Sequence, residues 1–389
     1  MDEPTINKTS LLTFGQYRIG GVQTFYKFLF AGNDNKEFNC EIIFYDKRNE
    51  LTPTLTEPWI ESAFQVFKYN PEKEEEFIYR NRLAQKLGNF KGVIITNFSL
   101  ELKSITKEVF QSNTIFHISH DDDYIPIAEM FQDRIDVFIC HNPTYFNLLR
   151  KRIPTRVDDI YYIPYGIIPS KRLNITTNST LKLVYFSRFD ETKGIQNIPL
   201  IDKILKENGI TVDWILMGDG PLRDKLQDII KDQPNFEYYK PKNAKEIYYQ
   251  LEKCDLFILP SYKDGLPIAM LESMSAGVVP IVFDFNEGIK DIIGDSGFVI
   301  ETNNFDELAE TIVHLNNDRS LLNEIKHRAR NLVLSEYNYK INSAKYFKLF
   351  SNYKSLRKDM LREKVNLNLL HKSFKIGLID KVKSIIRTR

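Results

Sequence analysis

The chain has 389 residues, with 53 lysines and arginines against 52 aspartates and glutamates, so its formal net charge is +1. This balance argues against a nucleic-acid partner, because such binding needs excess positive charge. The three cysteines lie far apart without paired spacing, which argues against a disulfide framework or a zinc site and favours a reducing compartment. We find no apolar run of roughly 18 residues that would predict a membrane span and no signal peptide, so we expect a cytoplasmic protein.

Short apolar runs alternate with helical periodicity along both halves of the chain. In the first half they predict strands at 11–14, 40–45, 64–69, 93–97, 114–119, 137–140 and 160–164. In the second half they predict strands at 181–186, 212–217, 236–239, 256–259, 279–282 and 298–300. Strands that alternate with helices form parallel βαβ units. The sequence therefore predicts an α/β protein with two parallel-sheet domains.

A polar stretch at 169–180, rich in Asn, Thr and Ser, separates the two sets of strands and is the predicted linker. From residue 304 onward the pattern is helical only. The predicted domains are 1–175 and 176–337, followed by a helix at 338–356 and a basic tail at 357–389.

The most informative segment, 260–272, follows the predicted strand 256–259 directly. Gly265 lets the backbone approach a ligand, and Pro267 suits the first turn of a helix. A helix N-terminus in this position offers free amides to an anion. Glu272 falls in the second turn among apolar residues, where a carboxylate needs hydrogen-bond donors such as ribose hydroxyls. The alternative is a solvated glutamate on an ordinary helix.

Two more strand-to-helix turns carry candidate ligand contacts. Arg188 and Lys193 lie five residues apart after the strand 181–186 and can converge on one phosphate, with Arg as a bidentate fork and Lys as a point charge. The alternative is a pair of solvated loop charges. The sequence 218–221, Gly-Asp-Gly-Pro, follows the strand 212–217 and is either a ligand contact or only a tight turn.

Two features of the first half also lie at the ends of predicted strands. Gly20 and Gly21 precede a helical run, where they allow a loop to approach a diphosphate or an acceptor, or simply form a turn. His120 ends the strand 114–119, where a side chain can contact a ligand in a cleft. A structural or surface histidine is the alternative.

Taken in this order, the motifs resemble those of the family 4 retaining glycosyltransferases, which have the GT-B fold. The resemblance is strongest over 183–299. Asp264 and Glu272 match the two acidic positions of the E-x7-E motif, although Glu is usual where Asp264 stands. Ser187-Arg188 with Lys193-Gly194 match the pyrophosphate-binding Arg and Lys, and 218–221 matches the G-x-G-P turn. Residues 163–166 match the I-P-x-G segment before the hinge. Gly20-Gly21 matches the glycine pair, and His120 matches the strand-end histidine near the donor sugar.

The resemblance implies two Rossmann-like domains whose parallel sheets face a central cleft, with C-terminal helices that cross back to the first domain. It implies that a nucleoside-diphosphate sugar, UDP- or GDP-linked, binds the second domain and that a glycan or lipid-linked acceptor binds the first. It also implies a retaining hexosyltransferase, in bacterial surface polysaccharide or glycoconjugate synthesis, that needs no metal cofactor.

The same resemblance implies roles for particular residues. Arg188 and Lys193 would stabilise the diphosphate that leaves, Glu272 would hold the ribose, and Asp264 would hold the sugar hydroxyls. The remaining predicted donor contacts are Gly20, Gly21, Ser187, Gly218, Gly265, Leu266, Pro267 and Lys240, the last of them in a loop near the base.

Three alternatives stay open at this point. A metal-dependent transferase of the other common fold would bind Mg²⁺ or Mn²⁺ through Asp121, Asp122 and Asp123. A sugar-nucleotide epimerase of similar fold would need no acceptor. A binding or scaffold protein would keep the fold without turnover.

The basic tail, 357–389, contains ten lysines or arginines and three acidic residues, a net charge of +7. Its apolar residues recur at helical spacing, as at Phe374, Leu378, Val382 and Ile386. Basic amphipathic helices bind anionic lipid surfaces, so we expect this segment to hold the protein on the inner face of the cell membrane. The alternative is a helix that packs on the first domain with its basic face in solvent.

Overall fold

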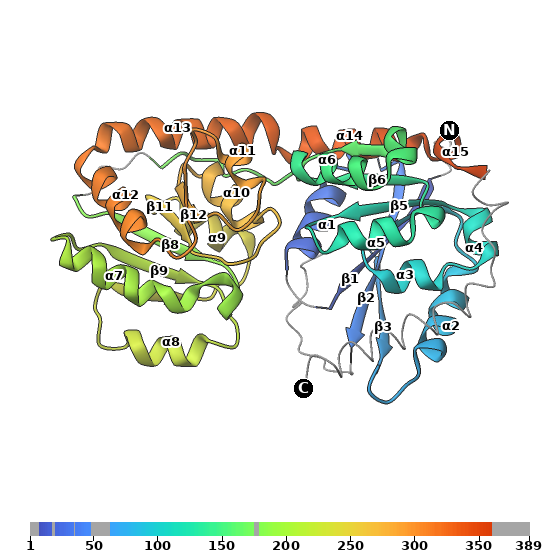
Figure 1. Cartoon of the computed structure of the whole chain (residues 1–389), viewed down its shortest axis with the longest axis horizontal. Coiled ribbons are helices and arrows are strands. Elements are labelled where there is room, and N and C mark those ends of the chain that lie inside the picture. The colour runs from blue at the N-terminus through green and yellow to red at the C-terminus, as the bar shows by residue number, and fades with distance from the viewer. Residues whose placement is uncertain (1–7, 18–19, 35, 48–62, 175–178, 360–389) are drawn as a thin grey trace, which may run out of the picture.

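The computed structural model contains two α/β lobes joined near the top of the view (Figure 1). The structure describes residues 8–17, 20–34, 36–47, 63–174 and 179–359, and the account below concerns these residues. Most of the predicted basic tail lies outside them, at 360–389.

The first domain is built on a parallel sheet that, within the described residues, has the strand order β3-β2-β1-β4-β5-β6-β7. Its strands are β1 (Thr9–Gln16), β2 (Phe38–Lys47), β3 (Ala63–Tyr69), β4 (Gly92–Thr96), β5 (Thr114–Ser119), β6 (Val137–Cys140) and β7 (Ile160–Tyr162). Its helices are α1 (Gly21–Ala31), α2 (Glu76–Leu87), α3 (Ser99–Ser104), α4 (Lys107–Ser112), α5 (Tyr124–Met130) and α6 (Pro143–Arg152).

The second domain repeats this plan with the parallel order β10-β9-β8-β11-β12-β13. Its strands are β8 (Lys182–Phe186), β9 (Asp213–Met217), β10 (Phe236–Tyr239), β11 (Leu256–Leu259), β12 (Val279–Phe283) and β13 (Phe298–Ile300). Its helices are α7 (Ile198–Glu207), α8 (Arg223–Ile230), α9 (Ala244–Leu251), α10 (Ile268–Ser275), α11 (Ile289–Ile293), α12 (Phe305–Asn317) and α13 (Arg319–Glu336).

Every strand predicted from the sequence is present, with ends that differ by up to two residues. The predicted strand 160–164 ends early, at Tyr162, because Pro164 has no N–H to give to a ladder. Strands such as β4 and β11 are buried along their whole length, as expected for parallel strands covered on both faces.

In each sheet the strand order reverses once, between β1 and β4 in the first domain and between β8 and β11 in the second. Open α/β sheets bind ligands in the crevice outside the carboxyl ends of the strands at such a point. The loops after β8 and β11 carry Arg188, Lys193 and Asp264, so the fold places the predicted motifs where a ligand site is expected.

After α13 the chain returns to the first domain, as Figure 1 shows for α14 (Tyr339–Ser351) and α15 (Tyr353–Leu356). The rings of Phe347 and Phe38 lie 5.2 Å apart, and Ser343 Oγ donates to Phe28 O at 3.4 Å. At the crossing, Ile167 N donates to Tyr337 O at 2.8 Å, so the two interdomain passages run side by side. The predicted return of the C-terminal helices is confirmed.

The first part of the predicted linker is attached to the second domain. Ser170 N donates to Ser275 Oγ at 2.9 Å, and Asn174 Nδ2 donates to Cys254 O at 2.6 Å. The predicted boundary at residue 175 coincides with 175–178, which lie outside the described residues. The chain therefore reaches the second domain before the polar stretch ends.

Among the described residues, no helix combines the length and the apolarity that a membrane crossing needs.

Candidate active site

The loops after β8 and β11 pack tightly on one another. Gly194 ends the short 3-10 turn Glu191–Lys193 with a φ of +73°, and a Cβ there would lie 1.8 Å from Pro260 O. Only glycine fits this position without displacing the backbone. Tyr262 N also donates to Thr192 O at 2.8 Å. Motifs that are about seventy positions apart in the sequence thus become one surface.

Lys193 joins these two loops through its side chain. Its Nζ donates to Asp264 Oδ2 at 2.7 Å and to the carbonyl oxygen of Lys263 at 2.9 Å. The structure therefore brings Lys193 and Asp264 together, although the sequence assigned them to different parts of the donor. The carboxylate of Asp264 neutralises the ammonium group of Lys193 in this arrangement.

Arg188 follows a similar pattern. Its Nε pairs with the carboxylate of Asp190, and the arginine side chain is half-exposed. Asp190 also accepts from Lys193 N, which caps the 3-10 turn. Hydrogen bonds from Thr192 and Arg188 hold the pKa of its carboxyl below the usual value despite partial burial. Convergence of Arg188 and Lys193 on one phosphate stays a prediction. A phosphate would have to replace two aspartates.

Helix α10 presents its N-terminus at the same place. Pro267 is the residue before the helix and has extended backbone, and no side chain caps the first turn. The prediction had placed Pro267 inside that turn, one position further along. Within the part of the chain that the structure describes, no side chain accepts from the amides that follow Pro267, which suits binding of an anion.

Glu272 lies in the second turn of α10 and is only 5% exposed. Burial raises the pKa of its carboxyl to about 8, although Lys27 on α1 of the first domain opposes this shift. Among the described residues, none donates a hydrogen bond to this carboxyl group. A buried carboxyl group that lacks hydrogen-bond donors from the protein suits a ligand whose hydroxyl groups can donate to it.

The Gly-Asp-Gly-Pro turn after β9 supports the Arg188 loop from behind. Gly218 has a φ of +147°, and a Cβ there would lie 2.0 Å from Ser187 O. Gly220 would meet the backbone of Phe189 at 2.5 Å. Lys240 lies beside this turn, with its Nζ 2.5 Å from Asp219 Oδ2. The glycines thus have a packing reason that does not depend on ligand contact.

In the first domain, Gly20 and Gly21 stand at the carboxyl end of β1. Gly20 is the residue before α1, and its backbone is fully extended. A Cβ at Gly20 would lie 2.9 Å from Gln23 Oε1, whereas one at Gly21 would meet nothing within 4 Å. Since residues 18–19 lie outside the described residues, direct donor contact by this pair stays a prediction.

His120 lies at the predicted strand end, but its ring is enclosed by protein. Nε2 lies 2.9 Å from Asn97 Oδ1 and Nδ1 lies 2.9 Å from Tyr165 OH. An amide oxygen only accepts, so Nε2 carries the proton and Tyr165 donates to Nδ1. Burial lowers the pKa of His120 well below 6.5. The carbonyl oxygen of His120 lies close to Gly265 of the second domain, where an added Cβ would be 2.5 Å from it.

The sequence analysis missed Asn97 and Tyr165 as the partners that fix His120. No local pattern marks them, because they come from other strands and loops. The one sequence feature that points to Asn97 and Tyr165 is a polar or phenolic residue at the end of a predicted strand.

Asp121, Asp122 and Asp123 follow β5 and, within the described residues, offer carboxylate oxygens within 4.8 Å of one another. Burial and the neighbouring carboxylates raise the pKa of Asp121 to about 6. Lys263 Nζ lies 2.8 Å from both carboxylate oxygens of Asp123. Lys263 Nζ also lies 3.9 Å from Asp122, so two of the three carboxylates pair with a lysine that the sequence did not indicate.

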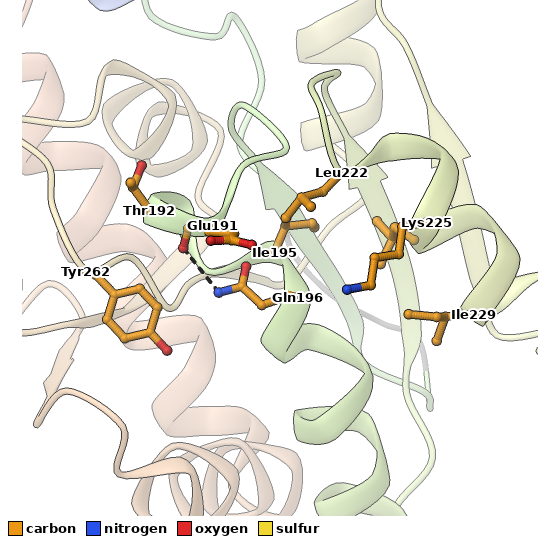
Figure 2. A pocket seen from close by; sticks show the side chains of 9 residues that line it. Glu191, Thr192, Ile195, Gln196, Leu222, Lys225, Ile229 and Tyr262 are labelled. Carbon is orange, nitrogen blue, oxygen red and sulfur yellow. Dashed lines mark hydrogen bonds between the residues drawn. The ribbon is translucent and has the colours of Figure 1, made fainter. Parts of the chain in front are cut away.

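A cavity of about 390 Å³ lies behind the Lys193 loop. In Figure 2, Thr192 and Tyr262 stand on one side and Lys225 and Ile229 on the other, and Gln196 Nε2 donates to Glu191 O at 3.1 Å. Its lining residues are Glu191, Thr192, Ile195, Gln196, Leu222, Lys225, Leu226, Ile229 and Tyr262, and they include none of the predicted catalytic residues.

Two Rossmann-like domains with facing switch points and a returning C-terminal helix define the GT-B fold. Solved structures agree across nearly the whole chain. Pneumococcal GtfA, described as an O-GlcNAc transferase in complex with UDP and GlcNAc, has a TM-score of 0.71 at 12% identity over 89% of this chain and 99% of that chain. Anabaena HepE in complex with UDP and glucose has a TM-score of 0.70 at 16% identity over 88% and 100%.

Sequence comparison identifies the second domain more closely. Residues 171–332 match the family model described as glycosyl transferases group 1. The amylovoran biosynthesis glycosyltransferase AmsK of Erwinia amylovora is 27% identical over 331 residues, 75% of this chain and 77% of that protein. The putative colanic acid biosynthesis glycosyltransferase WcaL of Salmonella typhimurium is 27% identical over 172 residues, which span 41% of this chain and 42% of that protein.

Proposed function

We propose that this chain transfers a hexosyl unit, with retention of configuration, from a nucleoside-diphosphate sugar to a glycan or lipid-linked acceptor of a bacterial surface polysaccharide. The names of AmsK and WcaL support the pathway class. GtfA and HepE, which were both solved with UDP, support a UDP-linked donor.

The observation that carries this proposal is the meeting of Lys193, Asp264 and the N-terminus of α10 at the switch point between β8 and β11. When the glycosidic bond breaks, negative charge grows on the diphosphate that leaves. A lysine, the nearby Arg188 and free helix amides are preorganised donors for such charge. The transition state carries positive charge on the sugar ring.

Donor binding then requires an exchange of partners. Lys193 exchanges its ion pair with Asp264 for one with the diphosphate, and the carboxylate of Asp264 then accepts hydrogen bonds from sugar hydroxyls. Glu272, buried in the second turn of the same helix, accepts from the ribose. Lys240 lies further out, beside the Gly218 turn, near the base.

The acceptor, in this proposal, enters from the first domain, along the carboxyl ends of its strands. The ring of His120 stabilises this edge of the sheet by hydrogen bonds to Asn97 and Tyr165, and its carbonyl oxygen lies close to Gly265 of the second domain. We place the protein in the cytoplasm, with the basic tail on the inner face of the membrane.

The test is an assay with labelled UDP- and GDP-hexoses and lipid-linked acceptors from a polysaccharide-producing bacterium. We expect label to move to the acceptor and turnover to continue in excess chelator, since lysine, arginine and helix amides do the work of a metal. Isomerised sugar nucleotide without acceptor would favour the epimerase. Loss of turnover in chelator with rescue by Mg²⁺ would favour the metal-dependent alternative.

A further inference from the structure

Lys263 of the second domain pairs with the acidic turn of the first domain, by which we mean residues 121–123. Its Nζ lies 2.8 Å from Asp123 and 3.9 Å from Asp122. The side chains of Lys263, Asp122 and Asp123 are at least half-exposed, and such ion pairs contribute little to the stability of a fold. An ion pair between two domains, however, also acts on the equilibrium between open and closed clefts.

The backbone of Lys263 holds the predicted phosphate-binding lysine. Its carbonyl oxygen accepts from Lys193 Nζ at 2.9 Å, and the next residue, Asp264, accepts from the same Nζ at 2.7 Å. The peptide bond is planar, so the backbone position of residue 263 largely fixes its carbonyl oxygen and the Cα of Asp264, from which the second acceptor extends. Where the side chain of Lys263 docks therefore influences where Lys193 lies.

Gly265, two residues after Lys263, also lies at the contact between the domains. Gly265 lies so near the first domain that an added Cβ would be 2.5 Å from His120 O. On the other side, Asn286 Nδ2 donates to the carbonyl oxygens of Asp264 and Gly265 at 3.0 and 2.8 Å. The loop 263–265 is therefore held by both domains at once.

We propose that Lys263 is a positioning residue. Its ion pair with the acidic turn couples closure of the cleft to the placement of Lys193 and Asp264 on the donor. The catalytic side of this inference rests on the proposed function. The coupling of the ion pair to domain separation does not.

A charge-reversal series tests the inference: Lys263→Glu, Asp123→Lys and the two together. Each single variant places like charges opposite one another, so we expect kcat/KM for the donor to fall roughly tenfold, mainly through KM, because closure precedes chemistry. The double variant restores an opposite pair and is expected to recover most of the loss. Lys290→Met is the control, since it removes a 2.6 Å ion pair with Asp284 inside one domain.

Small-angle scattering of the same proteins without ligand gives a readout independent of turnover. We expect a larger radius of gyration for each single variant and a return toward the wild-type value in the double variant. Singles that match wild type in both kcat/KM and radius, or a double variant no better than the worse single, would overturn the inference. If no sugar nucleotide is turned over at all, the proposed function fails, while the scattering series still decides the role of the ion pair.

Discussion

The carboxyl group of Glu272 makes the stability of the protein depend on pH. In the folded chain burial raises the pKa of this group to about 8, whereas an exposed glutamate ionises near 4.5. Between these two values the folded state holds one more proton than the unfolded state. Stability therefore falls as pH rises through this window.

We predict that Glu272→Gln is more stable than wild type at pH 9 and that the difference shrinks as pH falls toward 5. The expected slope is at most about 1.4 kcal/mol per pH unit within the window. Urea unfolding at several pH values measures it. A difference that does not change with pH would mean that Glu272 is ionised in the free protein.

The same group links pH to donor binding. Ribose hydroxyls that donate to an ionised Glu272 would lower its pKa, so binding would release a proton. We expect the affinity of wild type for a nucleoside diphosphate, relative to that of Glu272→Gln, to rise between pH 6 and pH 8. A constant ratio across this range, measured by calorimetry, would remove Glu272 from the ribose site.

The candidate residues differ in how far the sequence could predict them. Arg188, Lys193, Asp264 and Glu272 follow apolar strands within short motifs, so their placement after β8 and β11 follows from the predicted alternation of strands and helices. The interaction of Lys263 with the acidic turn could not be predicted, because it depends on how two domains face one another and no local pattern encodes that geometry.

At the scale of elements, the turn after β9 depends on its glycines. We predict that Gly218→Ala destabilises the protein by more than about 1–3 kcal/mol, because it combines a φ of +147° with a contact of 2.0 Å to Ser187 O. Gly209→Ala is the matched control. It has a φ of +78° but nothing within 4 Å of an added Cβ, so we expect roughly 1 kcal/mol.

Equal losses of unfolding free energy in the two variants, measured by urea denaturation, would show that φ alone matters at Gly218. A larger loss at Gly218 is the expected result, because a φ of +147° and the close approach of Ser187 O both act there, whereas Gly209 has only a positive φ.

The strands were predicted well because buried parallel strands form continuous apolar runs bounded by turns, and this signal is local. Short helices such as α3 and α11 could not be predicted in the same way, since they have little periodicity. The position of His120 at a strand end could be predicted from the local sequence. Its enclosure by Asn97 and Tyr165 could not, because these residues come from segments far apart in the sequence.

At the scale of the whole molecule, charge is unevenly distributed. The basic tail carries +7, which leaves −6 for the rest of the chain. We predict that the full chain binds anionic liposomes at low salt, that high salt weakens this binding, and that a chain ending at Leu356 does not bind. Equal binding of both chains, or binding by neither, in co-sedimentation would contradict the membrane role.

The central claim is that the switch point between β8 and β11 binds a nucleoside diphosphate through Arg188 and Lys193. Calorimetric titration of UDP and GDP into wild type, Lys193→Ala and the Lys290→Met control tests it most directly. We predict binding by wild type and the control, and a loss of at least tenfold in affinity for Lys193→Ala with an unchanged melting temperature. Binding of equal strength in all three proteins, or no binding of either nucleotide by wild type, would contradict the account.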